Sequence, residues 1–128
     1  MNEKLRDFLN KPLRIGNRTI QRRLSLAPMV GLTHVAFREI LESYGGYGLM
    51  WTEMCSAKSV PQENRHKSGI FCWRDKESTD LVCQVMGSTP EVMASAAARI
   101  EREGLFGVDL NMGCSISTIC KKGSGAAL

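Results

Sequence analysis

The sequence predicts an α/β fold in which parallel strands alternate with helices. Short apolar runs begin near residues 24, 49, 81 and 107, and helical patterns follow the first and third of them. The length of 128 residues is enough for one domain with its own core. This order implies parallel strands joined by right-handed crossovers. A doubly wound sheet and the first half of a (β/α)8 barrel both fit, and periodicity leaves both open.

The first strand, the first helix and the second strand are predicted between residues 24 and 54. Leu24–Val30 is an apolar run that reaches a turn at Pro28. Thr33–Tyr44 has a helical pattern, with its first residue as the N-cap and Gly45 as the C-terminal stop. Leu49–Met54 is the second strand. One face of the helix carries Phe37, Ile40, Leu41 and Tyr44.

A third strand and the best-defined helix follow a polar stretch, Cys55–Thr79, which we interpret as loop and short helix. The strand is Asp80–Gly87. Ser88 and Glu91 match a capping box, and the helix should end before Gly104. Pro90 suits the first turn, and the apolar face consists of Val92, Met93, Ala96 and Ile100.

The fourth strand is predicted at Gly107–Gly113, and the last residues open another helix near Gly125. Ligands of parallel α/β folds bind at the carboxyl ends of the strands. Gln84 and Asn111 lie there, and each amide can both donate and accept, as the edge of a flat heterocycle requires. Such amides also satisfy neighbouring loops, so both roles are open. Asp109 shares a strand face with Asn111, and we interpret it as a hydrogen-bonded scaffold residue.

Composition and charge are those of an ordinary globular protein. Hydrophobic residues make up 43% and charged residues 23%, which argues against disorder. The net charge of +4 is compatible with a nucleic-acid partner without requiring one. No run approaches the ~20 apolar residues that span a bilayer, and the N-terminus lacks a signal or transit pattern. We expect a cytoplasmic protein without a membrane partner.

The five cysteines form an odd set in a chain without an export signal, which favours reduced thiols. No CxxC is present and the two histidines are isolated, so no metal site is predicted. We interpret Cys55, Cys72 and Cys83 as structural. Cys114 has three readings from the residues alone: a reactive thiol, half of a pair, or a small residue in a turn. Cys120 stands where a phosphatase loop would need arginine.

Four ordered blocks between Leu24 and Leu128 match the motifs of one enzyme family. They are LAPMVGLTHVAFREI, WTEM, CQVMGSTPE, and GVDLNMGC with KKGSGAAL downstream. They resemble the APM-x-G-x-T-x-x-x-F-R opening, the second strand, the Q-x-x-G-x-x-P-E segment and the D-x-N-x-G-C-P…K-x-G-x-G-A-x-L signature of the tRNA-dihydrouridine synthases. Each block alone is weak, and their shared order makes the resemblance specific.

The resemblance implies a flavin-dependent (β/α)8 barrel that reduces a uridine of tRNA to 5,6-dihydrouridine, with FMN as cofactor and NADPH as reductant. Hydride reaches C6 of the uracil, and the residue that matches Cys114 protonates C5. Ordinary cysteine thiols are largely protonated at neutral pH, which suits a general acid. The uracil must leave its stack to be reached.

The resemblance also assigns binding residues by position. Pro28, Met29 and Val30 match the strand-one turn against the flavin, and Gln84 matches a residue that contacts the flavin ring. Asn111 matches an asparagine near both the flavin and the uracil. Lysines downstream, Lys121 and Lys122, would meet tRNA phosphates, and a solvated loop pair is an equal alternative.

Two features depart from the family pattern. Ser115 follows Cys114 where the family usually has proline, and we expect it to loosen the turn. A full barrel needs ~250 residues. We therefore expect residues 1–128 to be the N-terminal portion of a flavin-binding barrel, without the family's C-terminal helical tRNA-binding domain, and nearly inactive alone. The alternatives are a flavin-dependent barrel oxidoreductase acting on a free pyrimidine or other small molecule, and a non-catalytic RNA-binding module.

Overall fold

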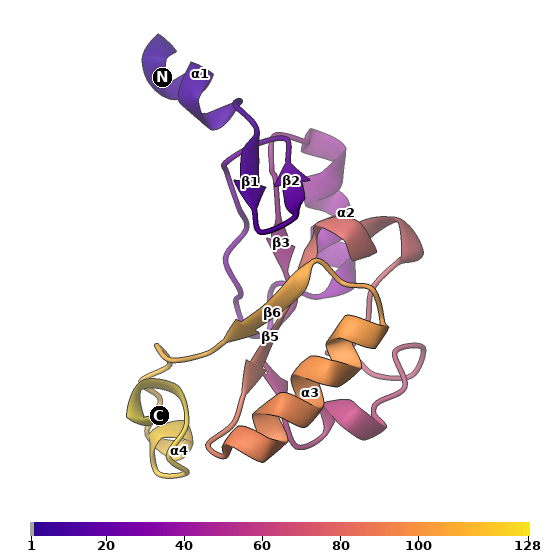
Figure 1. The fold of residues 1–128 in the computed structure, drawn as a ribbon, viewed down its shortest axis with the longest axis vertical. Helices are drawn as coiled ribbons and strands as arrows, with labels where there is room; N and C mark the ends of the chain where they lie inside the picture. Colours follow the sequence, from indigo (N-terminus) through magenta and orange to yellow (C-terminus); the bar gives the residue numbers. More distant parts are fainter. Residues whose placement is uncertain (1) are drawn as a thin grey trace.

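A computed structural model describes residues 2–128, and a parallel sheet organises the fold (Figure 1). Its strands are β3 (Met50–Trp51), β4 (Cys55–Ser56), β5 (Leu81–Met86) and β6 (Gly107–Leu110). Val82 pairs with both β3 and β6, and Val85 pairs with both β4 and β6. β6 therefore lies along one edge of β5, and β3 and β4 lie one after the other along the opposite edge. A single parallel bridge from Ser25 to Leu49 adds the segment before β3. The neighbours in the sheet therefore follow chain order.

Two predicted strands are less regular than expected. The first, Leu24–Val30, makes only the Ser25 bridge and two flanking backbone hydrogen bonds, and the chain then turns. The second is interrupted between β3 and β4. The Thr52 hydroxyl accepts a hydrogen bond from the Gln84 amide at 3.2 Å, so a side chain replaces the backbone carbonyl that a regular ladder would use. The third strand is confirmed as β5, whereas β6 ends at Leu110, before the predicted Gly113.

The first predicted helix is α2 (Val35–Tyr44), and Gly45 ends it with a φ of +65° as predicted. Thr33 is not the N-cap. It is fully buried and its hydroxyl donates to the Met29 carbonyl, so His34 caps the helix through its side-chain nitrogen. The apolar face is also not a core face. Ile40 and Tyr44 are exposed, and the helix buries Arg38 instead.

The second predicted helix is α3 (Pro90–Arg102), with proline at its first position as predicted. The capping box of Ser88 and Glu91 does not form. Thr89 is the N-cap residue, and no side chain caps the helix there. The predicted apolar face is confirmed, because Met93, Ala96 and Ile100 are buried against alternate residues of β5, namely Leu81, Cys83 and Val85.

The N-terminal segment forms elements for which the sequence analysis made no prediction. These are α1 (Glu3–Leu9) and an antiparallel hairpin of β1 (Leu13–Ile15) and β2 (Arg18–Ile20), seen at the top of Figure 1. Ile20 packs with Leu49 and Val82 on the sheet face opposite α3. The Arg18 side chain donates to the Leu105 carbonyl at 3.0 Å. The hairpin therefore covers part of the second face of the sheet.

A buried ion pair joins α2 to the segment before β5. This segment holds two 3-10 turns, η1 (Val60–Gln62) and η2 (Asp75–Asp80). The prediction of loop and short helix for Cys55–Thr79 is met there, but it missed strand β4 at the start of the stretch. The Arg38 guanidinium lies 2.7 Å from the Glu77 carboxylate, and both side chains are 1% exposed. Burial alone would raise the pKa of Glu77. Hydrogen bonds from Arg38 and Arg74 outweigh burial and hold that pKa below its ordinary value.

The chain closes with a short helix, α4 (Ser117–Cys120), and a 3-10 turn, η3 (Gly125–Ala127). A helix near Gly125 was predicted, and the structure has the 3-10 turn there. Within residues 2–128, no helix combines the length and the apolar character that crossing a membrane requires. The same residues contain no group of three or more His, Cys, Asp or Glu side chains placed to hold a metal ion.

Candidate functional site

A hollow of about 450 Å³ lies at the carboxyl ends of β5 and β6. Its apolar lining includes Pro28, Val30 and Met54. Its polar lining consists of Gln84, Asp109, Asn111 and the Cys114 segment. The structure therefore brings together five residues that the sequence assigned to one site: Pro28, Val30, Gln84, Asn111 and Cys114.

Asp109 fixes the orientation of the Gln84 amide. The Gln84 nitrogen donates to the Asp109 carboxylate at 2.7 Å, and the Trp51 indole nitrogen donates to the same oxygen at 3.1 Å. The Gln84 oxygen accepts a hydrogen bond from the Asn111 amide at 2.9 Å. Asp109 is thus the hydrogen-bonded scaffold residue that was predicted. Gln84 keeps one N–H and one lone pair free of these bonds.

Asn111 connects the Gln84 amide to the loop that carries Cys114. Its oxygen accepts hydrogen bonds from the backbone amides of Gly113 and Cys114, at 3.3 and 3.0 Å. Its nitrogen also lies 3.3 Å from the sulfur of Met54. An asparagine side chain that accepts from the amides two and three residues further on forms a local turn. Asn111 therefore sets the path of the chain as it leaves β6.

Cys114 is half-buried, and its carbonyl oxygen is held from the far side of the same loop. It accepts a hydrogen bond from the Ala126 amide at 2.9 Å, and the Cys120 thiol lies 3.5 Å from it. Gly125 has a φ of +65°, and a Cβ at that position would lie 2.4 Å from the same oxygen. Cys120 thus contacts the backbone of Cys114. Among residues 2–128, Ser115 offers its amide to no acceptor.

The turn after the first sheet segment is held by two buried side chains. Glu53 is 8% exposed, and its carboxylate accepts a hydrogen bond from the Gly31 amide at 2.6 Å. Thr33 both donates to the Met29 carbonyl and accepts from the Met29 amide. Thr33 was predicted to cap the first helix, and its hydrogen bonds to Met29 place it in this turn instead. The sequence signal for the turn was a carboxylate at a strand end together with a glycine after Val30.

Three predicted site residues lie outside the hollow. Met29 belongs to the turn but is not part of the lining. Lys122 lines a neighbouring hollow, and Lys121 lines neither of the two. Both lysines are exposed.

The structural interpretation of Cys55 and Cys83 is confirmed. Their sulfurs lie 3.9 Å apart in the core, and both residues are buried. The hydrogen bond with Cys83 and burial raise the pKa of the Cys55 thiol. Cys72 is half-buried, and burial raises its pKa as well. Cys55 and Cys72 are therefore poor candidates for chemistry at neutral pH. The hydrogen bond with Cys55 lowers the pKa of Cys83, but Cys83 is fully buried, and none of the three thiols lines the hollow of Cys114.

The structure is an α/β fold with a hollow at the carboxyl ends of its parallel strands, which is where folds of this class bind small molecules. A family model described as dihydrouridine synthase matches residues 25–128. The chain belongs to the dihydrouridine synthase family.

Curated relatives agree with this assignment. The chain is 36% identical over 116 residues to the tRNA-dihydrouridine synthase B of Pseudomonas aeruginosa, covering 91% of this chain and 34% of the relative. It is 38% identical over 117 residues to the protein of the same name from Vibrio vulnificus, covering 91% and 35%. The corresponding values for Pasteurella multocida are 36% over 117 residues, 91% and 34%. The chain thus spans about a third of the length of these relatives.

Proposed function

We propose that this chain supplies part of the catalytic site of a tRNA-dihydrouridine synthase, which reduces uridine in tRNA to 5,6-dihydrouridine with FMN as cofactor and NADPH as reductant. The observation that carries the proposal is the position of Cys114 beside Gln84 and Asn111 in one hollow at the strand ends. The names of the relatives support tRNA as the substrate. The reduced cysteines favour a cytoplasmic enzyme.

The barrel architecture belongs to the same proposal. Successive segments of the sheet are neighbours in chain order, from Ser25 through β3, β4 and β5 to β6. A closed barrel has this order throughout, whereas a doubly wound sheet reverses its order at a switch point. Residues 1–128 would correspond to the N-terminal portion of the barrel, about its first four strand–helix units. A C-terminal helical tRNA-binding domain would lie outside them.

The residues around the hollow fit a flavin ring. The volume of about 450 Å³ is within the range of ~300–1,000 Å³ typical of cofactor sites. Pro28 and Val30 offer an apolar surface from the strand-one turn. Met29, between them in the sequence, would support this turn from outside the lining. Gln84 offers its remaining N–H and lone pair to the polar edge of a ring. When bound there, reduced FMN would supply the hydride for C6 of the uracil.

Cys114 and Asn111 would act on the uracil. The Cys114 thiol would donate its proton to C5, from a loop held by the Asn111 side chain and the Ala126 amide through hydrogen bonds to the Cys114 backbone. Asn111 lies near enough to orient the uracil as well as the loop, since it lines the same hollow. The uridine has to leave its stack before either residue can reach it. Lys121 and Lys122, which are exposed on the same loop, would bind tRNA phosphates.

A hybrid enzyme tests this function. Residues 25–128 would replace the matching segment of the P. aeruginosa relative, and the product would be measured by mass spectrometry of unmodified tRNA incubated with FMN and NADPH. We expect dihydrouridine in tRNA from the hybrid, and none after Cys114→Ala. A folded, flavin-loaded hybrid that makes no dihydrouridine would contradict the proposal.

Two controls separate the alternatives. An oxidoreductase for a free pyrimidine would reduce free uridine as readily as uridine in tRNA. We expect the hybrid to reduce uridine in tRNA and not free uridine. A non-catalytic RNA-binding module would bind tRNA in a salt-dependent manner and would be indifferent to Cys114→Ala.

A further inference from the structure

A second hollow, of about 360 Å³, lies beside the first, where β5 meets the N-terminus of α3. Its polar lining comes from three separate segments. Lys58 follows β4, Ser88 and Thr89 precede α3, and Lys122 and Ser124 belong to the loop after α4. No Asp or Glu of the described residues lines it. Its chemistry is therefore cationic and rich in hydrogen-bond donors.

The N-terminus of α3 contributes uncapped amides to this hollow. The first intrahelical bond runs from the Met93 amide to the Thr89 carbonyl, and Pro90 has no N–H. Neither the Glu91 amide nor the Val92 amide donates to any residue in the range 2–128. The expected Ser88 cap is not made. Two donors at the positive end of a thirteen-residue helix therefore lack an acceptor, and one of them belongs to Val92, which lines the hollow.

Ser124 provides an independent indication of a ligand. The residue is only 5% exposed, and across the described part of the chain its hydroxyl makes no hydrogen bond. Its oxygen is not sealed inside the protein, so it stays accessible to a ligand from the hollow. Gly123, with a φ of +66°, brings this loop against Ser88, whose Cβ would lie 3.7 Å from a Cβ added at the glycine. The loop thus closes over the helix end and holds the Ser124 side chain at the hollow.

Lys58 and Lys122 supply the charge. Both are exposed, and neither forms an ion pair within residues 2–128. They come from loops far apart in the sequence, and they lie on one hollow with a helix N-terminus. Backbone N–H groups, a hydroxyl and lysines are the donors that proteins use for phosphate.

We propose that this hollow binds a backbone phosphate of the RNA substrate. The inference rests on the proposed function, since it takes the RNA to be the strand whose uridine enters the first hollow. The loop that supplies Lys122 and Ser124 begins at Cys114 and returns to it, through the hydrogen bond from Ala126 to the Cys114 carbonyl. A phosphate held at the second hollow would therefore fix the RNA strand, and the thiol loop with it, beside the extruded base.

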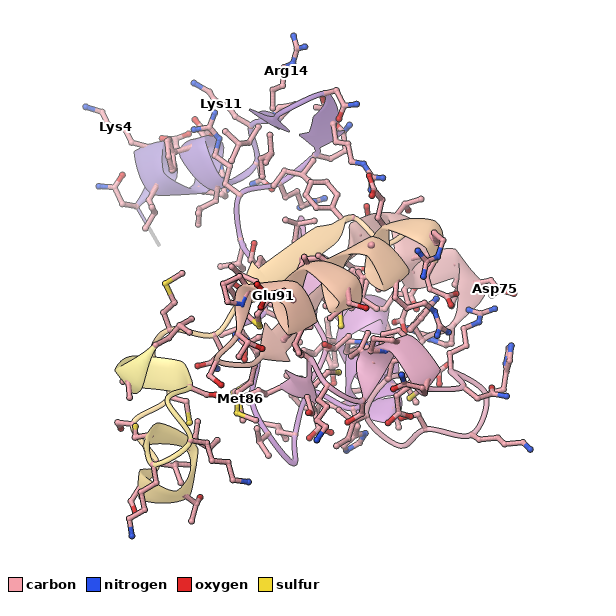
Figure 2. The ribbon with its side chains drawn as sticks, turned by 60° about the horizontal axis from the view of Figure 1, so that its bottom comes forward. Lys4, Lys11, Arg14, Asp75, Met86 and Glu91 are labelled. Carbon is pink, nitrogen blue, oxygen red and sulfur yellow. The ribbon has the colours of Figure 1, made fainter. Side chains whose placement is uncertain are left out.

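The test compares two lysine variants of this chain in binding to an unmodified tRNA transcript over a series of salt concentrations. Lys58→Ser removes a charge from the hollow. Lys4→Ser is the matched control, because Lys4 lies on α1, at the opposite end of the molecule from Met86 at the end of β5 (Figure 2). We expect Lys58→Ser to weaken binding about three- to tenfold and to reduce the slope of log K against log salt by about 1. Lys4→Ser should leave both unchanged.

A second measurement reports on the hollow directly. The ¹H–¹⁵N signals of the Glu91 and Val92 amides should shift when the tRNA transcript is added, and Ser124→Ala should reduce the shift and the affinity. Circular dichroism would establish that each variant is folded. Equal affinity and slope for Lys58→Ser and Lys4→Ser, in folded proteins, would overturn the proposal. So would the same amide shifts with NADPH or inorganic phosphate but none with tRNA.

The proposed function fails in a different way. Dihydrouridine that depends on Cys114, together with tRNA affinity that is independent of Lys58, would overturn this site alone. Salt-dependent binding that requires Lys58 supports the site even where the hybrid enzyme makes no dihydrouridine.

Discussion

The side-chain oxygen of Asn111 accepts a hydrogen bond from the Cys114 amide at 3.0 Å, so the residue that follows β6 fixes the loop that carries the thiol. The side-chain nitrogen of Asn111 donates to the Gln84 side-chain oxygen, and the Gln84 nitrogen donates in turn to the Asp109 carboxylate. The position of the thiol therefore depends on side chains from two neighbouring strands. The predictions below test that dependence.

Removing the Asn111 side chain should impair catalysis more than binding. Asn111→Ala frees the Gly113 and Cys114 amides, and a misplacement of about 1 Å can cost ~100-fold in rate. We expect the hybrid enzyme to form dihydrouridine about 10- to 100-fold more slowly, with tRNA affinity nearly unchanged. Asn64→Ala is the control, because Asn64 holds the His66 amide in a similar turn outside the hollow. Equal rates for the two variants would contradict the positioning role.

A side chain at Gly125 should displace the backbone of Cys114. In Gly125→Ala the new Cβ would lie 2.4 Å from the Cys114 carbonyl oxygen, and φ is +65°. Gly46→Ala introduces the backbone strain alone, since φ is +85° and nothing lies within 4 Å of its Cβ. Gly46→Ala should lose about 1–2 kcal/mol of unfolding free energy, and Gly125→Ala should lose more because the clash with backbone adds to the strain. Only Gly125→Ala should also reduce the rate of dihydrouridine formation in the hybrid.

The ion pair of Arg38 and Glu77 should be needed for stability and not for chemistry. Arg38→Met leaves a buried carboxylate with less compensation, which costs about 3–5 kcal/mol. Urea unfolding of this chain measures the loss. Arg102→Met, at the exposed end of α3, is the control and should cost less than about 0.5 kcal/mol. If Arg38→Met also lost less than about 0.5 kcal/mol of unfolding free energy, the ion pair would make no contribution to stability.

The same pair predicts acid sensitivity. The pKa of Glu77 is lowered in the folded chain, so the unfolded chain binds more protons near the ordinary glutamate pKa of ~4.3. The contribution of Glu77 to stability is complete above that pH and is lost as pH falls through the lower, folded pKa. Urea unfolding between pH 6 and pH 3 should show the decline. Glu77→Gln should be less stable at pH 6 and should decline less steeply, and an unchanged slope would contradict the assignment.

Local patterns predicted the parts of the fold that rest on neighbouring residues. The apolar face of α3 and the βαβ order are examples, because burial against β5 needs only the helical period. The register that brings Asn111 against Gln84 was not predictable, since it depends on how β6 pairs with β5. The cap of α2 was wrong because tertiary contacts claimed Thr33. The N-terminal hairpin had a usable signal, a Gly16-Asn17 turn between two short segments, Leu13–Ile15 and Arg18–Ile20.

The choice of thiol is the most direct test of the central claim, that Cys114 protonates the uracil. Cys120 lies on the same loop and contacts the backbone of Cys114, so it is the natural comparison. Dihydrouridine in tRNA, measured by mass spectrometry with the hybrid enzyme, should fall at least 100-fold in Cys114→Ala and by much less in Cys120→Ala, with both variants binding tRNA normally. Product that survives Cys114→Ala but is lost in Cys120→Ala would contradict the account.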